Sequence, residues 1–200
     1  MMENERIVVF DLDGTLVDSW ESIVACLSMT VERLFHRLIP DTFFSSYDIR
    51  HLGMLFRHCH ECYANDMCWR DFKKATDEFY VRHCIDKVTV IPKGREIVEE
   101  VRLKGYGCVV LTNKLQLAAD ILCASLFGVS TFRGVVGRSG IRMIKPHQYA
   151  VAAMRRNGID PEHCAAYIGD SDVDAAMAVR LDVPYFDINT CTTEIIMNEL

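Results

Sequence analysis

The chain has 200 residues, of which 50% are hydrophobic and 25% are charged, and its formal net charge is -6 at pH 7. This composition is typical of a globular protein with a buried core, and it excludes an intrinsically disordered chain. The negative charge and the lack of a dense run of Lys and Arg argue against binding to a nucleic acid polymer.

In chain order, the first predicted element is a strand over Ile7–Phe10, where four apolar residues follow one another. A continuous apolar run is typical of a strand that is buried on both faces, as in a parallel sheet. From residue 19 to residue 87 there is no strand pattern, and amphipathic periodicity predicts three or four helices with breaks at Pro40 and near Asn65 and Asp66. We therefore predict a helical domain inserted after the first strand.

After residue 87, predicted strands and helices alternate. The strands are Cys108–Leu111, Val135–Val136, Ala165–Ile168 and Pro184–Phe186, and helical periodicity covers residues 94–104, 115–127, 147–157 and 172–181. This alternation predicts right-handed βαβ units and an α/β fold with a doubly wound, Rossmann-like parallel sheet. The core domain would contain residues 1–18 and 88–200, and the helical domain residues 19–87.

The chemically distinctive residues follow the predicted strands. Asp11 and Asp13 come directly after the first strand, and residues two apart in an extended chain project to the same side. Gly14 then allows a sharp turn. Because open parallel sheets bind ligands at the carboxyl ends of their strands, we expect both carboxylates to face one ligand.

Two further segments offer groups for an anion. Thr112 and Asn113 follow the strand Cys108–Leu111, and their hydroxyl and amide groups suit phosphate oxygens. Lys145 precedes Pro146, a residue preset for a first helical turn, so the lysine is expected at the positive end of the next helix. A cation in that position can hold an anionic group.

A dense run of carboxylates follows the strand Ala165–Ile168. Asp170, Asp172 and Asp174 open a predicted helix, and carboxylates beside Asp11 would repel it unless a cation lay between them. Mg²⁺ is a hard cation that prefers oxygen ligands, so the two acidic segments predict a magnesium site. For Asp172 a simpler role is favoured, namely stabilising the helix N-terminus through its dipole.

These segments resemble the four motifs of the haloacid dehalogenase-like superfamily of hydrolases, and in particular its phosphoglycolate phosphatase-like branch. In family order, the motifs are residues 11–19, 111–113, 145–146 and 169–174. The resemblance extends over the whole chain, because the family inserts its helical cap after the first motif. It implies a Mg²⁺-dependent phosphatase, that is, a phosphoric monoester hydrolase.

The resemblance also implies a role for each residue. Asp11 would attack phosphorus and form an aspartyl-phosphate, while Asp13 would act as acid and then as base. The metal would bind Asp11, Asp170 and the backbone carbonyl of Asp13, with Asp174 orienting its surroundings. The phosphoryl group would be bound by Thr112, Asn113 and Lys145. The expected substrate is a small phosphorylated metabolite such as phosphoglycolate, a sugar phosphate or a nucleotide.

Other functions are compatible with parts of this pattern. A phosphomutase of the same superfamily would share the aspartyl-phosphate, and a non-catalytic binding or regulatory protein could retain the fold. A dehalogenase is disfavoured because it does not need the acid at Asp13. The intact set of motif residues favours an active phosphatase over a binding protein.

The remaining features concern the cellular setting. The sequence contains nine cysteines, no secretory signal pattern, and no apolar stretch near the roughly 20 residues that would span a membrane. We therefore expect reduced thiols, a cytoplasmic location and no membrane partner. In the segment His58–Cys62, with Cys68 nearby, Cys59 and Cys62 have a C-x2-C spacing but no second C-x2-C pairs with it as in a zinc motif, so partly buried helix thiols are favoured there.

Overall fold

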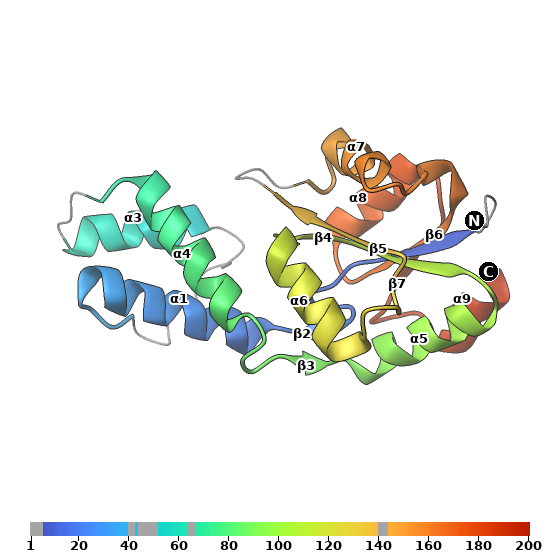
Figure 1. The fold of residues 1–200 in the computed structure, drawn as a ribbon, viewed down its shortest axis with the longest axis horizontal. Helices are drawn as coiled ribbons and strands as arrows, with labels where there is room; N and C mark the ends of the chain where they lie inside the picture. The colour runs from blue at the N-terminus through green and yellow to red at the C-terminus, as the bar shows by residue number, and fades with distance from the viewer. Residues whose placement is uncertain (1–5, 40–42, 44–51, 64–66, 140–143) are drawn as a thin grey trace. The chain divides into compact units, whose positions relative to one another are not determined.

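The computed structural model describes residues 6–39, 43, 52–63, 67–139 and 144–200. The chain divides into two compact units (Figure 1). The first unit contains Met1–Ser19 and Val88–Leu200, and the second contains Trp20–Lys87. Each unit has its own hydrophobic core.

The first unit is built on a parallel sheet with the strand order β5-β4-β1-β6-β7. Its strands are β1 (Ile7–Phe10), β4 (Gly107–Leu115), β5 (Gly134–Arg138), β6 (Cys164–Gly169) and β7 (Tyr185–Asp187). All four residues of β1 are buried, as their unbroken apolar run predicts for a central strand. The predicted α/β doubly wound fold is confirmed.

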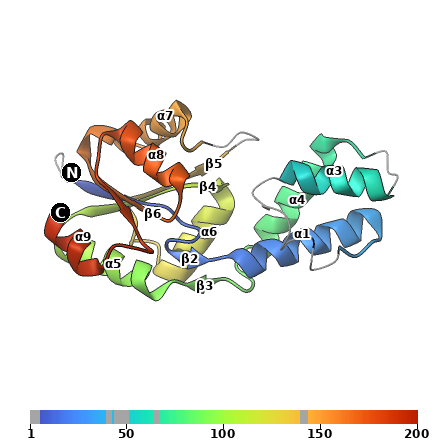
Figure 2. The same ribbon diagram turned by 180° about the vertical axis from the view of Figure 1, so that it is seen from behind.

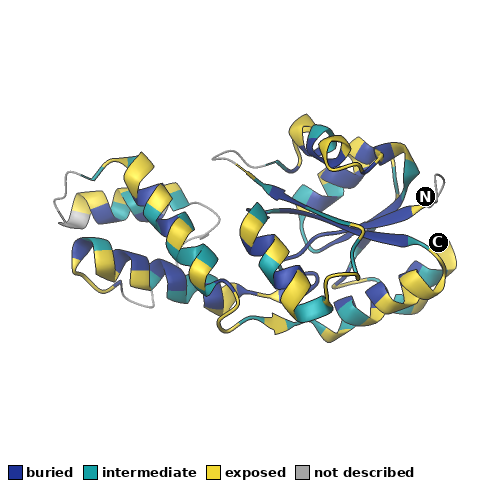
Figure 3. Ribbon diagram, viewed as in Figure 1, coloured by how far each residue is buried: buried dark blue, intermediate teal, exposed yellow. Residues whose placement is uncertain are grey.

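Helices cover both faces of this sheet (Figures 1 and 2). One face carries α5 (Pro92–Leu103), α6 (Gln116–Phe127) and α9 (Thr193–Glu199), and the other carries α7 (Gln148–Arg156) and α8 (Asp172–Leu181). Successive β1 side chains point to opposite faces, so Val8 and Phe10 join the first core while Ile7 and Val9 join the second. Figure 3 shows the sheet as a buried layer between helices with exposed outer faces.

The order of the strands places a topological switch point between β1 and β6. The chain leaves β1 toward β4 on one side, whereas it leaves β6 toward β7 on the other side. At such a switch point the two connections diverge and leave space at the carboxyl ends of the strands. Asp11 follows β1 and Asp170 follows β6, so both acidic segments begin at this switch point.

Some elements differ from those predicted. Helix α7 begins at Gln148 with His147 as its N-cap, so Pro146 lies before the helix and not in its first turn, and Lys145 lies three residues before the helix. The sequence also missed α9 and a short antiparallel pair of β2 (Val17–Asp18) with β3 (Thr89–Val90). Two-residue strands are too short to produce a recognisable periodicity.

The second unit is helical, with α1 (Trp20–Phe35), α3 (Leu52–Tyr63) and α4 (Trp69–His83) as its longer described helices. Its core is rich in aromatic side chains, and Phe72 is fully buried against Phe35 and Phe56. The predicted breaks at Pro40 and at Asn65 and Asp66 lie outside the described residues.

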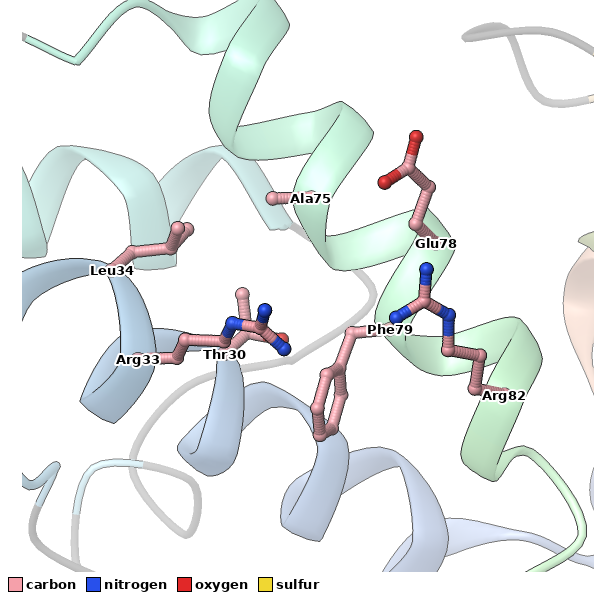
Figure 4. Close-up of a pocket in the computed structure, with 7 residues that line it drawn as sticks. All are labelled: Thr30, Arg33, Leu34, Ala75, Glu78, Phe79 and Arg82. Atoms are coloured by element: carbon pink, nitrogen blue, oxygen red, sulfur yellow. The ribbon is translucent and has the colours of Figure 1, made fainter.

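A pocket of about 250 Å³ lies between α1 and α4 of the helical unit (Figure 4). Arg33 of α1 and Arg82 of α4 line it together with Glu78 and Phe79. Two arginines and one glutamate line this pocket, so its lining has a formal charge of +1 when all three are ionised.

Within the described part of the chain, no helix is long and apolar enough to cross a membrane.

Candidate active site

Lys145 links two carboxylates at the switch point between β1 and β6. Its Nζ lies 2.7 Å from Oδ1 of Asp11 and 2.6 Å from Oδ1 of Asp174. The backbone N–H of Asp11 donates to the carbonyl of Ile168 at 2.9 Å, which fixes the start of the first motif against β6. The lysine and both carboxylates are buried, so solvent screens these ion pairs only weakly.

Asp174 is held by several donors of the protein itself. The carboxylate is fully buried and accepts hydrogen bonds from the Tyr167 hydroxyl at 3.1 Å and from the Ser171 hydroxyl at 2.5 Å. With Lys145, these contacts engage both of its oxygens. Asp174 therefore has a fixed position and can orient its neighbours.

Asp11, Asp170 and Asp174 form a group in which one oxygen of each carboxylate lies within 4.8 Å of the others. Two glycines permit this close approach. A Cβ on Gly14, whose φ is +81°, would lie 2.2 Å from Oδ2 of Asp170, and a Cβ on Gly169 would lie 2.5 Å from Cβ of Asp174. Any side chain at these glycines would collide with the acidic group.

Burial and mutual repulsion make this group difficult to ionise. Burial raises the pKa of Asp11 from 3.8 to about 7; Lys145 opposes the rise and Asp174 adds to it. The pKa of Asp170 is raised as well, first by burial and then by Asp174. Burial lowers the pKa of Lys145, but Asp11 and Asp174 outweigh that effect and keep it above its ordinary value. The lysine therefore stays charged while Asp11 is ionised only with difficulty.

Asp13 points toward a different cation. Its Oδ1 lies 2.6 Å from Nζ of Lys114 and accepts a hydrogen bond from the Ser19 hydroxyl at 2.5 Å. The Lys114 side chain is only 3% exposed, whereas that of Asp13 is 31% exposed. Asp13 thus stands between a buried ammonium group and solvent.

Thr112 and Asn113 have different surroundings, although they are neighbours at the end of β4. Oγ1 of Thr112 accepts from the backbone N–H of Lys114 at 3.1 Å, and its hydroxyl hydrogen can still be donated to a ligand. Oδ1 of Asn113 accepts from the backbone N–H groups of Ile144 and Lys145, both at 2.8 Å, and its amide donates to the carbonyl of Lys145 at 3.1 Å. Asn113 therefore fixes the backbone that carries Lys145.

The structure brings most of the predicted site residues together but adds others. Asp11, Lys145, Asp170 and Asp174 share one cluster, and Asp13 lies beside them with its own lysine. Sequence reasoning did not select Lys114, Tyr167, Ser19 or Ser171. Two of these carried a signal: Lys114 stands two residues after Thr112 on a strand, and Tyr167 places a hydroxyl in an otherwise apolar buried run.

Among the side chains that the structure describes, the cysteine-rich segment of α3 forms no group of three metal-ligating residues. The ring of His58 packs on Phe43 and that of His60 on Phe56, while Cys59 is buried. The side chain of Cys62 lies outside the described residues. None of the described cysteines forms a disulfide bond.

The acidic cluster fits a divalent cation. The site combines four carboxylates with two ammonium groups, so its formal charge is -2 when all six are ionised. The carboxylates are those of Asp11, Asp13, Asp170 and Asp174, and the ammonium groups are those of Lys114 and Lys145. Apart from its own backbone N–H, no described residue donates a hydrogen bond to the Asp170 carboxylate or forms an ion pair with it. The atoms of this cluster that could coordinate a metal ion are carboxylate oxygens, which hard cations such as Mg²⁺ prefer.

The chain is similar to known proteins over nearly its whole length. A model of the family described as haloacid dehalogenase-like hydrolase matches residues 8–188. The chain is 26% identical to a phosphoglycolate phosphatase of Aquifex aeolicus over 177 residues, which cover 88% of this chain and 80% of that protein. It is 28% identical to a phosphoglycolate phosphatase of Neisseria gonorrhoeae over 191 residues, with coverages of 88% and 78%.

Solved structures share the fold. One from Haemophilus somnus, provisionally described as a phosphoglycolate phosphatase, superimposes with a TM-score of 0.71 at 18% identity and covers 98% of this chain and 92% of its own. Another from Thermotoga maritima, provisionally described as a beta-phosphoglucomutase, has a TM-score of 0.66 at 19% identity, with coverages of 91% and 84%.

Proposed function

The chain belongs to the haloacid dehalogenase-like hydrolase family, and from this premise we propose that it is a Mg²⁺-dependent phosphatase of small phosphomonoesters. The observation that carries the proposal is the Asp11–Lys145–Asp174 chain of ion pairs beside Asp170, at the switch point of the sheet. The phosphatase names of the curated relatives support the same reaction class.

Asp11 is the proposed nucleophile. Its carboxylate attacks phosphorus, the bond from phosphorus to the ester oxygen breaks, and an aspartyl-phosphate forms. Lys145 holds the carboxylate by an ion pair of 2.7 Å and balances charge on the transferring group. Because Asp174 holds Lys145 from the other side, the lysine is oriented before the substrate arrives.

Asp13 is the proposed acid and base. Its Oδ1 is occupied by Ser19 and Lys114, whereas its Oδ2 accepts no hydrogen bond from the described residues. Oδ2 can therefore protonate the leaving oxygen and later remove a proton from the water that attacks the aspartyl-phosphate. The partial exposure of Asp13 gives this oxygen access to both the leaving group and water.

Mg²⁺ would be held by the carboxylates of Asp11 and Asp170 and by the backbone carbonyl of Asp13. When bound, it would offset the negative charge of the carboxylates and polarise the phosphoryl oxygens. Asp174 would orient this site through Ser171 and Lys145 without being a ligand, because its oxygens are already engaged.

The hydroxyl of Thr112 and the ammonium of Lys145 would bind the phosphoryl oxygens. Positioning and charge stabilisation of this kind are the main contributions of a protein to phosphoryl transfer. Asn113 would contribute mainly by fixing the backbone of residues 144 and 145. The helical unit Trp20–Lys87 would serve as the cap that selects among small phosphorylated metabolites.

The test is phosphate release from a panel of small phosphomonoesters, with Mg²⁺ and with a chelator. We expect turnover to require Mg²⁺ and to fall about a thousandfold or more in Asp11→Asn. Asp172→Asn is the matched control, because Asp172 is an exposed carboxylate in the first turn of α8. Turnover that is equal in Asp11→Asn and wild type would refute the proposal.

A sugar phosphate added as acceptor separates the phosphatase from a phosphomutase. A mutase would move the phosphoryl group to the sugar, whereas the proposed enzyme releases inorganic phosphate to water.

A further inference from the structure

We propose that the pocket between α1 and α4 binds a small molecule that carries a phosphate group on an apolar body. Every residue of its lining belongs to the helical unit, whereas the acidic cluster belongs to the first unit, so this binding site does not depend on the proposed function. The pocket volume of about 250 Å³ is slightly below the roughly 300 Å³ at which pockets for drug-sized ligands begin. Its ligand would therefore have the size of a small metabolite.

The first argument is that two guanidinium groups line one pocket without a partner in the described protein. Arg33 of α1 and Arg82 of α4 are exposed, and neither side chain forms a hydrogen bond or ion pair with any residue that the structure describes. Both lie in the last turn of their helices, where a positive charge is favourable, but that effect does not occupy the guanidinium N–H groups. Because a guanidinium group matches phosphate oxygens with two parallel hydrogen bonds, these arginines suit a phosphate dianion.

The second argument is that the one carboxylate of the lining does not neutralise these arginines. Glu78 lies four residues before Arg82 on α4, a spacing at which an ion pair can form. Within the described part of the chain, however, its only ion pair is with Lys74, at 3.9 Å. Figure 4 shows the Glu78 carboxylate directed away from the guanidinium groups of Arg33 and Arg82. The part of the pocket that the arginines line is therefore positive, which favours an anionic ligand over a neutral one.

The third argument is the apolar surface beside the arginines. Leu34 of α1 and Phe79 of α4 line the pocket and are half-buried, so a ligand can cover their remaining exposed surface. The Phe79 ring stacks on the ring of His83 with centroids 4.5 Å apart, which fixes its orientation. Thr30 adds no free donor, because its buried hydroxyl donates to the carbonyl of Cys26 at 2.7 Å. An apolar body attached to the phosphate would bury surface that a bare phosphate ion leaves in water.

The experiment titrates the full chain with phenylphosphonate, whose carbon–phosphorus bond is not an ester and is not hydrolysed by a phosphatase. The readout is the shift of the backbone amide signals of the pocket lining in two-dimensional NMR spectra, with a chelator present. We expect a Kd in the millimolar range or below. Methylphosphonate, which lacks the ring, and benzoate, which carries one negative charge, should both bind more weakly.

Variants then assign the binding to the arginines. Arg33→Ala and Arg82→Ala should each raise the Kd about tenfold to a hundredfold, the range for a hydrogen bond between charged groups. Arg70→Ala is the matched control and should leave the Kd unchanged, because Arg70 is an exposed arginine of α4 that does not line the pocket. Thr112→Val, which removes a proposed phosphate ligand of the first unit, should also leave the shifts of the lining amides unchanged.

Several results would overturn the proposal. Wild-type lining amides that do not shift with millimolar phenylphosphonate would refute it without any variant. An unchanged Kd in both Arg33→Ala and Arg82→Ala, or an equal loss of binding in Arg70→Ala, would show that these two guanidinium groups do not hold the anion. Loss of the shifts in Thr112→Val would assign the binding to the first unit. Benzoate or methylphosphonate binding as tightly as phenylphosphonate would refute the ligand class. None of these readouts involves hydrolysis, so each leaves the proposed function intact.

Discussion

Replacing Asp11 with Asn should stabilise the metal-free protein at alkaline pH, although it removes the proposed nucleophile. Burial raises the pKa of Asp11 from 3.8 to about 7, so the folded protein holds this proton more tightly than the unfolded chain does. Ionising Asp11 therefore costs the folded state free energy as the pH rises from about 4 through 7. Asparagine resembles the protonated side chain in shape and avoids that cost.

The size of the effect follows from the pKa. A tenfold change in an acid dissociation constant corresponds to about 1.4 kcal/mol, so a rise from 3.8 to about 7 amounts to about 4 kcal/mol at high pH. Asp11 is buried, so solvent does not screen this effect strongly. At pH 4.5 the same relation gives a cost of only about 1 kcal/mol for ionising Asp11 in the folded state. The reason is that pH 4.5 is only slightly above 3.8, the pKa of this carboxyl in the unfolded chain.

The assay is urea unfolding of wild type and Asp11→Asn at pH 4.5 and pH 8.5, with a chelator present. We expect the advantage of the variant in unfolding free energy to grow by about 3 kcal/mol between the two pH values. Asp172→Asn is the control and should have a small effect of equal size at both pH values, because Asp172 is exposed. If Asp11→Asn is destabilised by the same amount at both pH values, the electrostatic account of the site is wrong.

Further predictions concern the residues around this carboxylate. Adding Mg²⁺ at a hundredfold excess over its Kd should stabilise wild type by about 2.7 kcal/mol in urea unfolding, and Asp11→Asn by less. Tyr167→Phe removes the hydroxyl that holds Asp174 at 3.1 Å; we expect a loss of about 1 kcal/mol in unfolding free energy and a lower kcat, and an unchanged kcat would contradict this positioning role. Asn113→Ala removes the acceptor for two backbone N–H groups and should raise KM for the phosphomonoester more than Asn113→Asp, which keeps an oxygen there. Gly14→Ala would collide with Asp170, so calorimetry should show at least tenfold weaker Mg²⁺ binding.

Much of the sheet could be predicted from the sequence because its strands are buried on both faces. A short unbroken apolar run such as Ile7–Phe10 is typical of a buried strand, and the polar residues that follow it mark the strand end. The same reasoning placed Asp11 and Asp170 at one edge of the sheet, since parallel strands end on the same side. Short local patterns were sufficient for these features.

Features that depend on contacts between distant segments could not be predicted in this way. The pairing of β2 with β3 joins residues about 70 positions apart through two residues on each strand. The ion pair of Lys114 with Asp13 joins residues 101 positions apart, and no periodicity indicates which carboxylate a buried lysine will meet. The start of α7 depends on the N-cap at His147. In a sequence, a histidine indicates the start of a helix less strongly than a proline such as Pro146 does.

The central claim is that Asp11 carries the phosphoryl group during turnover. The most direct measurement is mass spectrometry of the protein after acid quenching within milliseconds of mixing with Mg²⁺ and a hydrolysed phosphomonoester. We expect a phosphoryl adduct on the peptide that contains Asp11, formed and lost at rates compatible with kcat, and no adduct in Asp11→Asn. Rapid turnover by wild type with no adduct on that peptide at any quench time would contradict the account.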